Sequence, residues 1–323
     1  MNPFQRTELE IAPAQHPITR DSKIICAGSC FTSMLGMQLA KYKFQTLVQP
    51  FGTIFNPITL SELFLADQHE IEQHSFLHQG VALNYKLNSN PFSAENIASL
   101  NGHIDSASRA LNSYLENATH LVITLGTAHV YFLKNTLEPV SNCHQLPATL
   151  FEKKMLRVEE VENCLSKLVN GLLKKNQNLK FILTVSPVRH VKDKLQTNSF
   201  SKAILRVAVD KICEQFDQAS YFPSYELLMD DLRDYRFYAE DLIHPSSEAE
   251  AYIWEKFSTS NFRSVELLQM KKLNQIYAAL SHKPRFSYSE NWPLFKQDLK
   301  QKLEQLGAEL DLSEERSLFE KLP

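Results

Sequence analysis

The sequence predicts an α/β fold built on a mostly parallel sheet, and two observations support that prediction. First, short apolar runs alternate along the chain with longer segments of helical periodicity, which is the element order of α/β proteins. Second, the runs at residues 120–125 and 180–185 are almost continuously apolar. Strands have this composition when helices cover both faces of their sheet.

Five apolar runs are expected to supply the strands, the last of them being the weakest. They lie at residues 23–27, 44–49, 120–125, 180–185 and 219–222.

Apolar residues recur at steps of three and four in the connections, which predicts amphipathic helices. One such segment follows the first strand, a second spans residues 161–173 and a third spans residues 202–216. The repeating apolar positions of the third segment are Ala203, Val207, Ile212 and Phe216.

The chain is expected to form one domain over residues 1–260, followed by a helical C-terminal extension over residues 261–323. Within the domain, the long connection of residues 58–118 forms either a cap over a site or surface structure. A Pro- and Trp-containing stretch at residues 283–293 divides the extension. The last helix carries leucines in heptad-like steps, at positions 299, 303, 306 and 310. We expect it to pack back on the domain, because a sustained coiled coil needs several more heptads; homo-oligomer formation is the alternative.

Composition bears on which classes of partner the protein has. The 323 residues carry a net charge of -3, so there is no basic excess for nucleic acid. No apolar stretch reaches the roughly 20 residues of a membrane helix, and no membrane association is expected. The 5 cysteines are scattered and no secretory signal is evident, which predicts a cytoplasmic location. The 11 histidines and the cysteines lack metal-site spacing, so neither a metal nor another cofactor is expected.

A Gly-Ser turn follows the first predicted strand, at the edge of the sheet where ligands bind in open α/β folds. Gly28 gives the backbone room for the turn. Ser29 then starts a helix, whose positive dipole end favours an anion. The functional interpretation makes Ser29 a nucleophile with its N–H aimed at that anion, and the alternative is a helix N-cap. Neighbours on a tight turn diverge, so the Cys30 side chain is expected to point elsewhere.

A second motif, Asp241-x-x-His244, precedes the last helix of the domain. His244 can accept a proton from a hydroxyl, and Asp241 can fix its tautomer if the intervening segment makes one turn. The alternative is a surface helix entry with an incidental histidine.

The order of these two motifs resembles that of SGNH or GDSL-type hydrolases, and Gly28-Ser29-Cys30-Phe31 resembles the GSCFA family in particular. Residues 50–53, 125–128, 186–190 and 231–235 fit the same resemblance. It implies a flavodoxin-like three-layer α/β/α fold that hydrolyses or transfers the acyl group of a small or carbohydrate-linked ester. Ser29 would attack the carbonyl, His244 would act as general base and then acid, and Asp241 would orient His244.

The resemblance also implies three oxyanion donors: the N–H of Ser29, the N–H of Gly52 and an asparagine side chain after the third strand. The chain has no asparagine there, which leaves Thr127 or His129 as substitutes, or two donors only. Losing one donor costs roughly a hundred- to a thousand-fold in rate. A catalytically weak or inactive binding module on the same fold is therefore the alternative function.

Three further residues are weaker candidates. Arg189 and His190 follow the fourth strand and are either substrate contacts, for an anionic or sugar group, or capping residues of a loop. Asn56 either lines the site or belongs to a turn.

Overall fold

The computed structural model describes residues 7–282 and 291–322, and its centre is a five-stranded parallel sheet in the order β10-β9-β5-β1-β2. Each neighbouring pair is parallel, as the sequence predicts. The bounds are β1 Lys23–Gly28, β2 Gln45–Val48, β5 His120–Leu125, β9 Lys180–Val185 and β10 Ala219–Phe222. All five predicted runs are therefore strands of one sheet.

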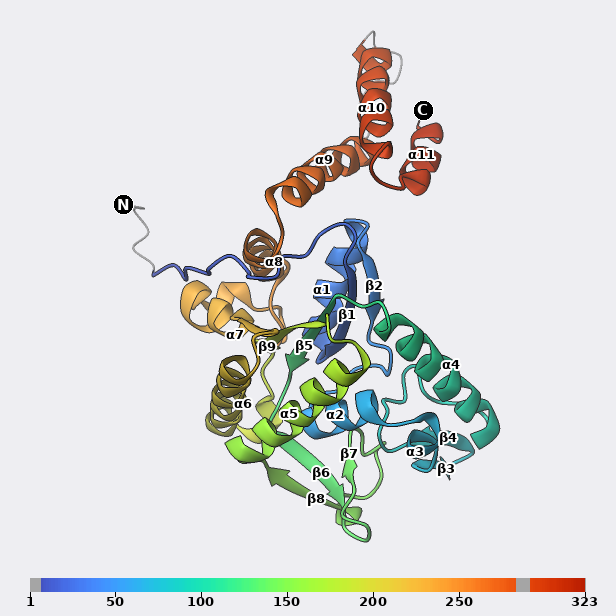
Figure 1. Cartoon of the computed structure of the whole chain (residues 1–323), viewed down its shortest axis with the longest axis vertical. Coiled ribbons are helices and arrows are strands. Elements are labelled where there is room, and N and C mark those ends of the chain that lie inside the picture. The colour runs from blue at the N-terminus through green and yellow to red at the C-terminus, as the bar shows by residue number, and fades with distance from the viewer. Residues whose placement is uncertain (1–6, 283–290, 323) are drawn as a thin grey trace.

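Helices cover both faces of this sheet (Figure 1). Successive strand residues point to opposite faces, so Ile25 of β1 belongs to one hydrophobic cluster and Ile24 to the other. The first cluster includes α2 Pro57–Leu65, α4 Ile97–Leu115, α5 Val158–Lys175 and α6 Leu195–Gln215. The second includes α1 Cys30–Lys41 and α8 Ser247–Asn261. The arrangement is a three-layer α/β sandwich.

The spacing of apolar residues and the caps explain these helices. Phe31, Met34, Leu35 and Leu39 form the buried face of α1. The side chains of Asn96 and Ser246 accept N–H groups in the first turns of α4 and α8, which satisfies donors that have no partner inside the helix.

The long connection of residues 58–118 continues from α2 into α3 Gln68–Glu72 and an antiparallel hairpin, β3 Ser75–His78 with β4 Val81–Asn84. It ends in α4, whose buried residues join the first hydrophobic cluster, so this helix covers the sheet rather than standing apart as filler.

A second antiparallel sheet was not predicted from the sequence. Its order is β7-β6-β8, with β6 His129–Leu133, β7 Pro139–Val140 and β8 Phe151–Met155. The middle residues of β8, Glu152 to Lys154, are exposed and charged, so this strand lacks the apolar pattern that marks the others.

Short helical segments connect the remaining elements: η1 Ala148–Leu150, η2 Val191–Asp193, α7 Ser224–Glu226, a π-helix over Leu227–Leu232 and η4 Tyr235–Phe237.

The C-terminal extension consists of α9 Ser264–Ser281, α10 Asn291–Gly307 and α11 Ser313–Glu320, which project from one end of the sandwich (Figure 1). Leu299, Leu303 and Leu306 of α10 are buried within the chain, in the cluster that also contains α9 residues. Three of the four heptad-like leucines are thus buried, and the fourth, Leu310, packs partly buried against the same cluster. Part of the predicted Pro- and Trp-containing stretch, residues 283–290, lies outside the described residues.

Across residues 7–282 and 291–322, no helix combines the length and the apolar character needed to cross a bilayer. Nor does this part of the chain contain a cluster of three or more His, Cys, Asp or Glu side chains suited to hold a metal ion.

Candidate active site

The N-terminus of α1 meets the loop that precedes α8, and the residue of α1 that reaches this loop is Cys30. Its Sγ lies 3.8 Å from Nε2 of His244. The side chains of Ser29 and Cys30 diverge as expected, but the expectation that Cys30 is the one that points elsewhere is wrong, because Cys30 faces His244. Cys30 is the first residue of α1 and is partly buried.

His244 and Asp241 form the pair that their spacing predicts. Nδ1 of His244 lies 2.7 Å from Oδ2 of Asp241, and Oδ1 accepts the backbone N–H groups of Ile243 and His244. The bond from His244 and these two N–H groups lower the pKa of Asp241 to about 2. With a proton on Nδ1 directed at the carboxylate, a neutral imidazole has its lone pair on Nε2, which faces Cys30.

Backbone contacts hold this loop in shape. The N–H of Ala239 donates to the carbonyl of His244 at 2.8 Å, and the N–H of Arg189 donates to the carbonyl of Ile243 at 3.2 Å. Between them, Leu242 has a φ of 56°, a left-handed conformation that non-glycine residues seldom adopt. The surrounding bonds therefore fix the loop, and with it the orientation of the imidazole.

Ser29, the predicted nucleophile, faces the interior instead. Its side chain is 1% exposed, and Oγ has no hydrogen-bond partner in the described part of the chain. Its N–H donates to the carbonyl of Thr124 at 2.9 Å, which continues the β1–β5 ladder by one residue. In this conformation neither the hydroxyl nor the N–H of Ser29 is available to a substrate. Ser29 is the N-cap residue of α1 by position, but its side chain makes no capping hydrogen bond.

The second expected oxyanion donor is also engaged in the backbone. The N–H of Gly52 donates to the carbonyl of Gln49 at 2.8 Å, inside the turn that follows β2. The Gln49 side chain in turn bonds the backbone of Gly28 through both its amide oxygen and its amide nitrogen. Both N–H groups that the resemblance implied as oxyanion donors are thus used for structure.

The substitutes proposed for the missing asparagine bond to one another and to their neighbours. Oγ1 of Thr127 lies 3.1 Å from Oγ of Ser201 and 3.4 Å from Nδ1 of His129. The N–H of Thr127 donates to the carbonyl of Phe55.

Asn56, a weaker candidate for the site, caps α2. Its Oδ1 accepts the N–H of Thr59 at 2.9 Å, and its side chain is buried. In this structure Asn56 is therefore the N-cap residue of α2.

Arg189 and His190 lie in different surroundings. The Arg189 guanidinium lies over the ring of Tyr238, 4.0 Å from its centroid, and lines a cavity of about 360 Å³ beside the π-helix. The His190 ring meets Phe55 edge-on at 5.6 Å, and its backbone N–H donates to Asn198. Arg189 is tied to the His244 loop through the backbone bond to Ile243 described above.

Two charged residues near the site were missed at the sequence level. Lys202 of α6 is 1% exposed, and its Nζ donates to the carbonyls of Gly126 and Ser186 at 2.6 and 2.7 Å. Glu250 of α8 is half-buried, and burial raises the pKa of its carboxyl. The sequence does contain a signal for the burial of Lys202. It lies three residues before Leu205 and seven before Val209, a spacing that places all three on one face of α6, and that face is buried.

Burial raises the pKa of the Cys30 thiol, and Glu250 acts in the same direction. Hydrogen bonds from backbone N–H groups at the start of α1 and the charge of Lys202 oppose that rise. The thiol is therefore protonated at neutral pH and needs a base, and the nearest base is Nε2 of His244.

Comparison with known proteins gives three results. The sequence model of the GSCFA family matches residues 23–257, which run from β1 into α8 and include Cys30, Asp241 and His244. No curated protein is similar enough to the chain to count as a match. A solved structure from Streptococcus pneumonia, provisionally named platelet activating factor, is similar at 10% sequence identity and a TM-score of 0.35, over 73% of this chain and 84% of that chain.

Proposed function

The chain belongs to the GSCFA family, and from this membership and the geometry of its site we propose that it hydrolyses an acyl ester or transfers the acyl group to an acceptor alcohol. The substrate class that we propose is an acylated carbohydrate or another small ester. One observation carries the proposal: Nε2 of His244 lies 3.8 Å from Sγ of Cys30, and Nδ1 of the same ring lies 2.7 Å from Oδ2 of Asp241. A nucleophile, a base and a group that orients the base are the parts that acyl transfer requires.

We propose Cys30 as the nucleophile, in place of the serine that the sequence suggests. The thiol is partly exposed and faces the base, whereas the Ser29 hydroxyl is buried and lacks a partner in the described chain. A thiol is also the more easily activated of the two groups, since its ordinary pKa lies far closer to neutral.

The reaction would proceed in two steps, and each step restores the protonation state of His244. In the first, Nε2 of His244 takes the thiol proton, sulfur bonds to the ester carbonyl carbon, the C–O bond breaks, and His244 protonates the departing alcohol. In the second, water or an acceptor alcohol attacks the thioester, His244 takes its proton, the C–S bond breaks, and His244 returns the proton to the sulfur to regenerate the Cys30 thiol. Asp241 stabilises the imidazolium in both steps.

A second candidate function is a binding module with little or no turnover. The observation that favours it is the state of the expected oxyanion donors, because the N–H groups of Ser29 and Gly52 both donate to backbone carbonyls. The N-terminus of α1, where the Cys30 N–H has no partner within the helix, is the remaining backbone source of positive potential.

Trapping of an acyl-enzyme tests these functions. An activated aryl ester is added to wild type, Ser29→Ala, Cys30→Ala and His244→Gln, and the acid-quenched proteins are digested and analysed by mass spectrometry. We expect one acyl group on the Cys30 peptide of wild type and Ser29→Ala, removed by neutral hydroxylamine as a thioester is, and none in Cys30→Ala. An adduct that survives Cys30→Ala and is lost in Ser29→Ala would return the nucleophile to Ser29. No adduct in any variant would favour the binding module.

A further inference from the structure

Lys202 carries a cationic group into the interior next to the candidate site. It lies on α6, is 1% exposed, and donates to the carbonyls of Gly126 and Ser186. These two residues directly follow β5 and β9, so the ammonium lies at the edge of the sheet where ligands bind in open α/β folds. β1, which leads into Cys30, is the next strand along that edge.

Among the described residues, the hydrogen-bond partners of this ammonium include no carboxylate. Within the described chain, both acceptors of Lys202 are neutral carbonyls and no ion pair involves it. Burying a charge without a counter-charge is costly, and here burial lowers the pKa of Lys202 to about 7. The single charge that raises this pKa is that of Cys30. A thiolate at Cys30 would therefore favour the charged form of Lys202.

Three titratable side chains act on Cys30, from the loop before α8, from α6 and from α8. His244 contacts the sulfur, Lys202 favours the thiolate from α6, and Glu250 opposes it from α8. Of these, Lys202 alone is fully buried, so water screens its charge least.

We propose that Lys202 is a positioning residue whose buried positive charge stabilises the Cys30 thiolate, and with it the negative charge that passes to the substrate oxygen during acyl transfer. This proposal rests on Cys30 being the nucleophile. It gives the site a source of positive charge that does not depend on the N–H groups of Ser29 and Gly52, which the backbone uses.

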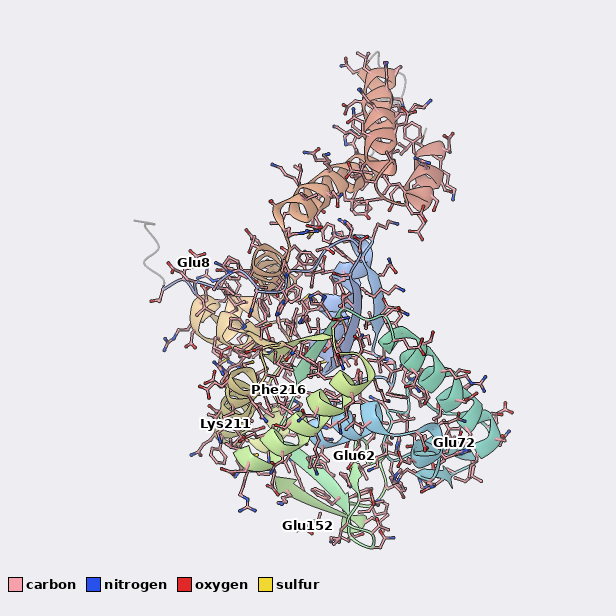
Figure 2. The ribbon with its side chains drawn as sticks, in the orientation of Figure 1. Glu8, Glu62, Glu72, Glu152, Lys211 and Phe216 are labelled. Atoms are coloured by element: carbon pink, nitrogen blue, oxygen red, sulfur yellow. The ribbon has the colours of Figure 1, made fainter. Side chains whose placement is uncertain are left out.

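The test is the pH dependence of alkylation at Cys30 by iodoacetamide, followed on the Cys30 peptide because the chain has 5 cysteines. Wild type is compared with Lys202→Met, and with Lys211→Met as the matched control. Lys211 is an exposed residue of α6 (Figure 2). Its Nζ donates to Glu162. Removing the buried charge should slow alkylation of Cys30 about tenfold below pH 7, where Lys202 is protonated. The rates should converge as pH rises above about 7 and Lys202 loses its proton, and Lys211→Met should follow wild type. Identical profiles for wild type and Lys202→Met would overturn the proposal.

A second measurement needs no change at Lys202, in case Lys202→Met does not fold. In a His244→Gln background, the rate of the anionic reagent iodoacetate is divided by that of neutral iodoacetamide. A nearby cation favours the anionic reagent, so this ratio should fall as pH rises through about 7 and Lys202 loses its proton. A ratio that does not change with pH would overturn the proposal. Neither measurement requires turnover, so a failed ester assay with a positive result here would contradict the proposed function alone.

Discussion

The Sγ atom of Cys30 lies 3.8 Å from Nε2 of His244, although 214 positions separate the two residues in the chain. Parallel β-sheet topology brings them together, because Cys30 follows the end of β1 and the His244 loop is tied to the segment after β9 through Arg189. The contact joins a thiol to a base that already has its orienting carboxylate.

The first prediction concerns that carboxylate. Asp241→Asn should lower kcat/KM for an acyl ester by about 10²- to 10⁴-fold, because an amide no longer fixes the tautomer that directs the Nε2 lone pair at Cys30. The pKa of Asp241 is lowered to about 2, so Asp241 stays ionised above about pH 3 and should add no ionisation to the pH profile there.

The measurement is kcat/KM against pH for wild type, Asp241→Asn and Asp234→Asn. Asp234 is the control, since it is an exposed carboxylate nearby that pairs with Arg236. Equal losses in both variants would argue against an orienting role for Asp241. An additional ionisation between about pH 3 and 5, the ordinary range of a carboxyl group, would show that Asp241 is not held as the geometry indicates.

The second prediction concerns the turn before Cys30. Gly28 has a φ of +126°, and a Cβ there would lie 2.1 Å from the carbonyl oxygen of Thr124. Gly28→Ala should therefore destabilise the fold by at least ~2 kcal/mol, because the turn would have to separate β1 from β5. Thermal or urea unfolding gives the measurement.

Gly102→Ala is the matched control for Gly28→Ala. Gly102 lies in α4, where an added Cβ would have no atom within 4 Å, so alanine should raise stability by roughly 0.5–1 kcal/mol. If Gly28→Ala is as stable as wild type, the strand end does not have the close packing described above.

The third prediction separates the two roles of Asn56. Asn56→Ala should lower the free energy of unfolding by about 1 kcal/mol through loss of the α2 cap, and leave kcat/KM of the folded protein unchanged. Asn96→Ala, which removes the cap of α4, provides the comparison. A loss of kcat/KM in Asn56→Ala that Asn96→Ala does not share would mean that Asn56 also lines the site.

The sequence was sufficient for the parallel sheet and for the pairing of Asp241 with His244. The three central strands β1, β5 and β9 could be predicted because they are apolar and buried on both faces. The pairing could be predicted because a three-residue spacing permits a single turn. The small sheet of β6, β7 and β8 could not be predicted, since β8 exposes Glu152 to Lys154 and has no apolar pattern.

The apolar face predicted for α6 was confirmed in its second half, where Ile212 and Phe216 are buried, and wrong in its first half. There Ala203 and Val207 are exposed, whereas Lys202, Leu205 and Val209 are buried. Residues that adjoin in a helix differ by about 100° in direction, so a shift of one position hides which side chains face the core. Because of that shift, the predicted apolar face does not reveal Lys202 as a buried charge.

The sequence by itself determined that a hydroxyl and a thiol stand side by side where β1 becomes α1, and only the tertiary structure decided which of them meets His244. The Ser29 N–H pairs with Thr124, so Ser29 still belongs to the strand and its side chain is enclosed by the sheet. Cys30 begins the helix, and its side chain turns toward the loop. The choice depends on where the β1–β5 ladder ends, and that point is fixed by the contact between two strands rather than by the residues of the turn.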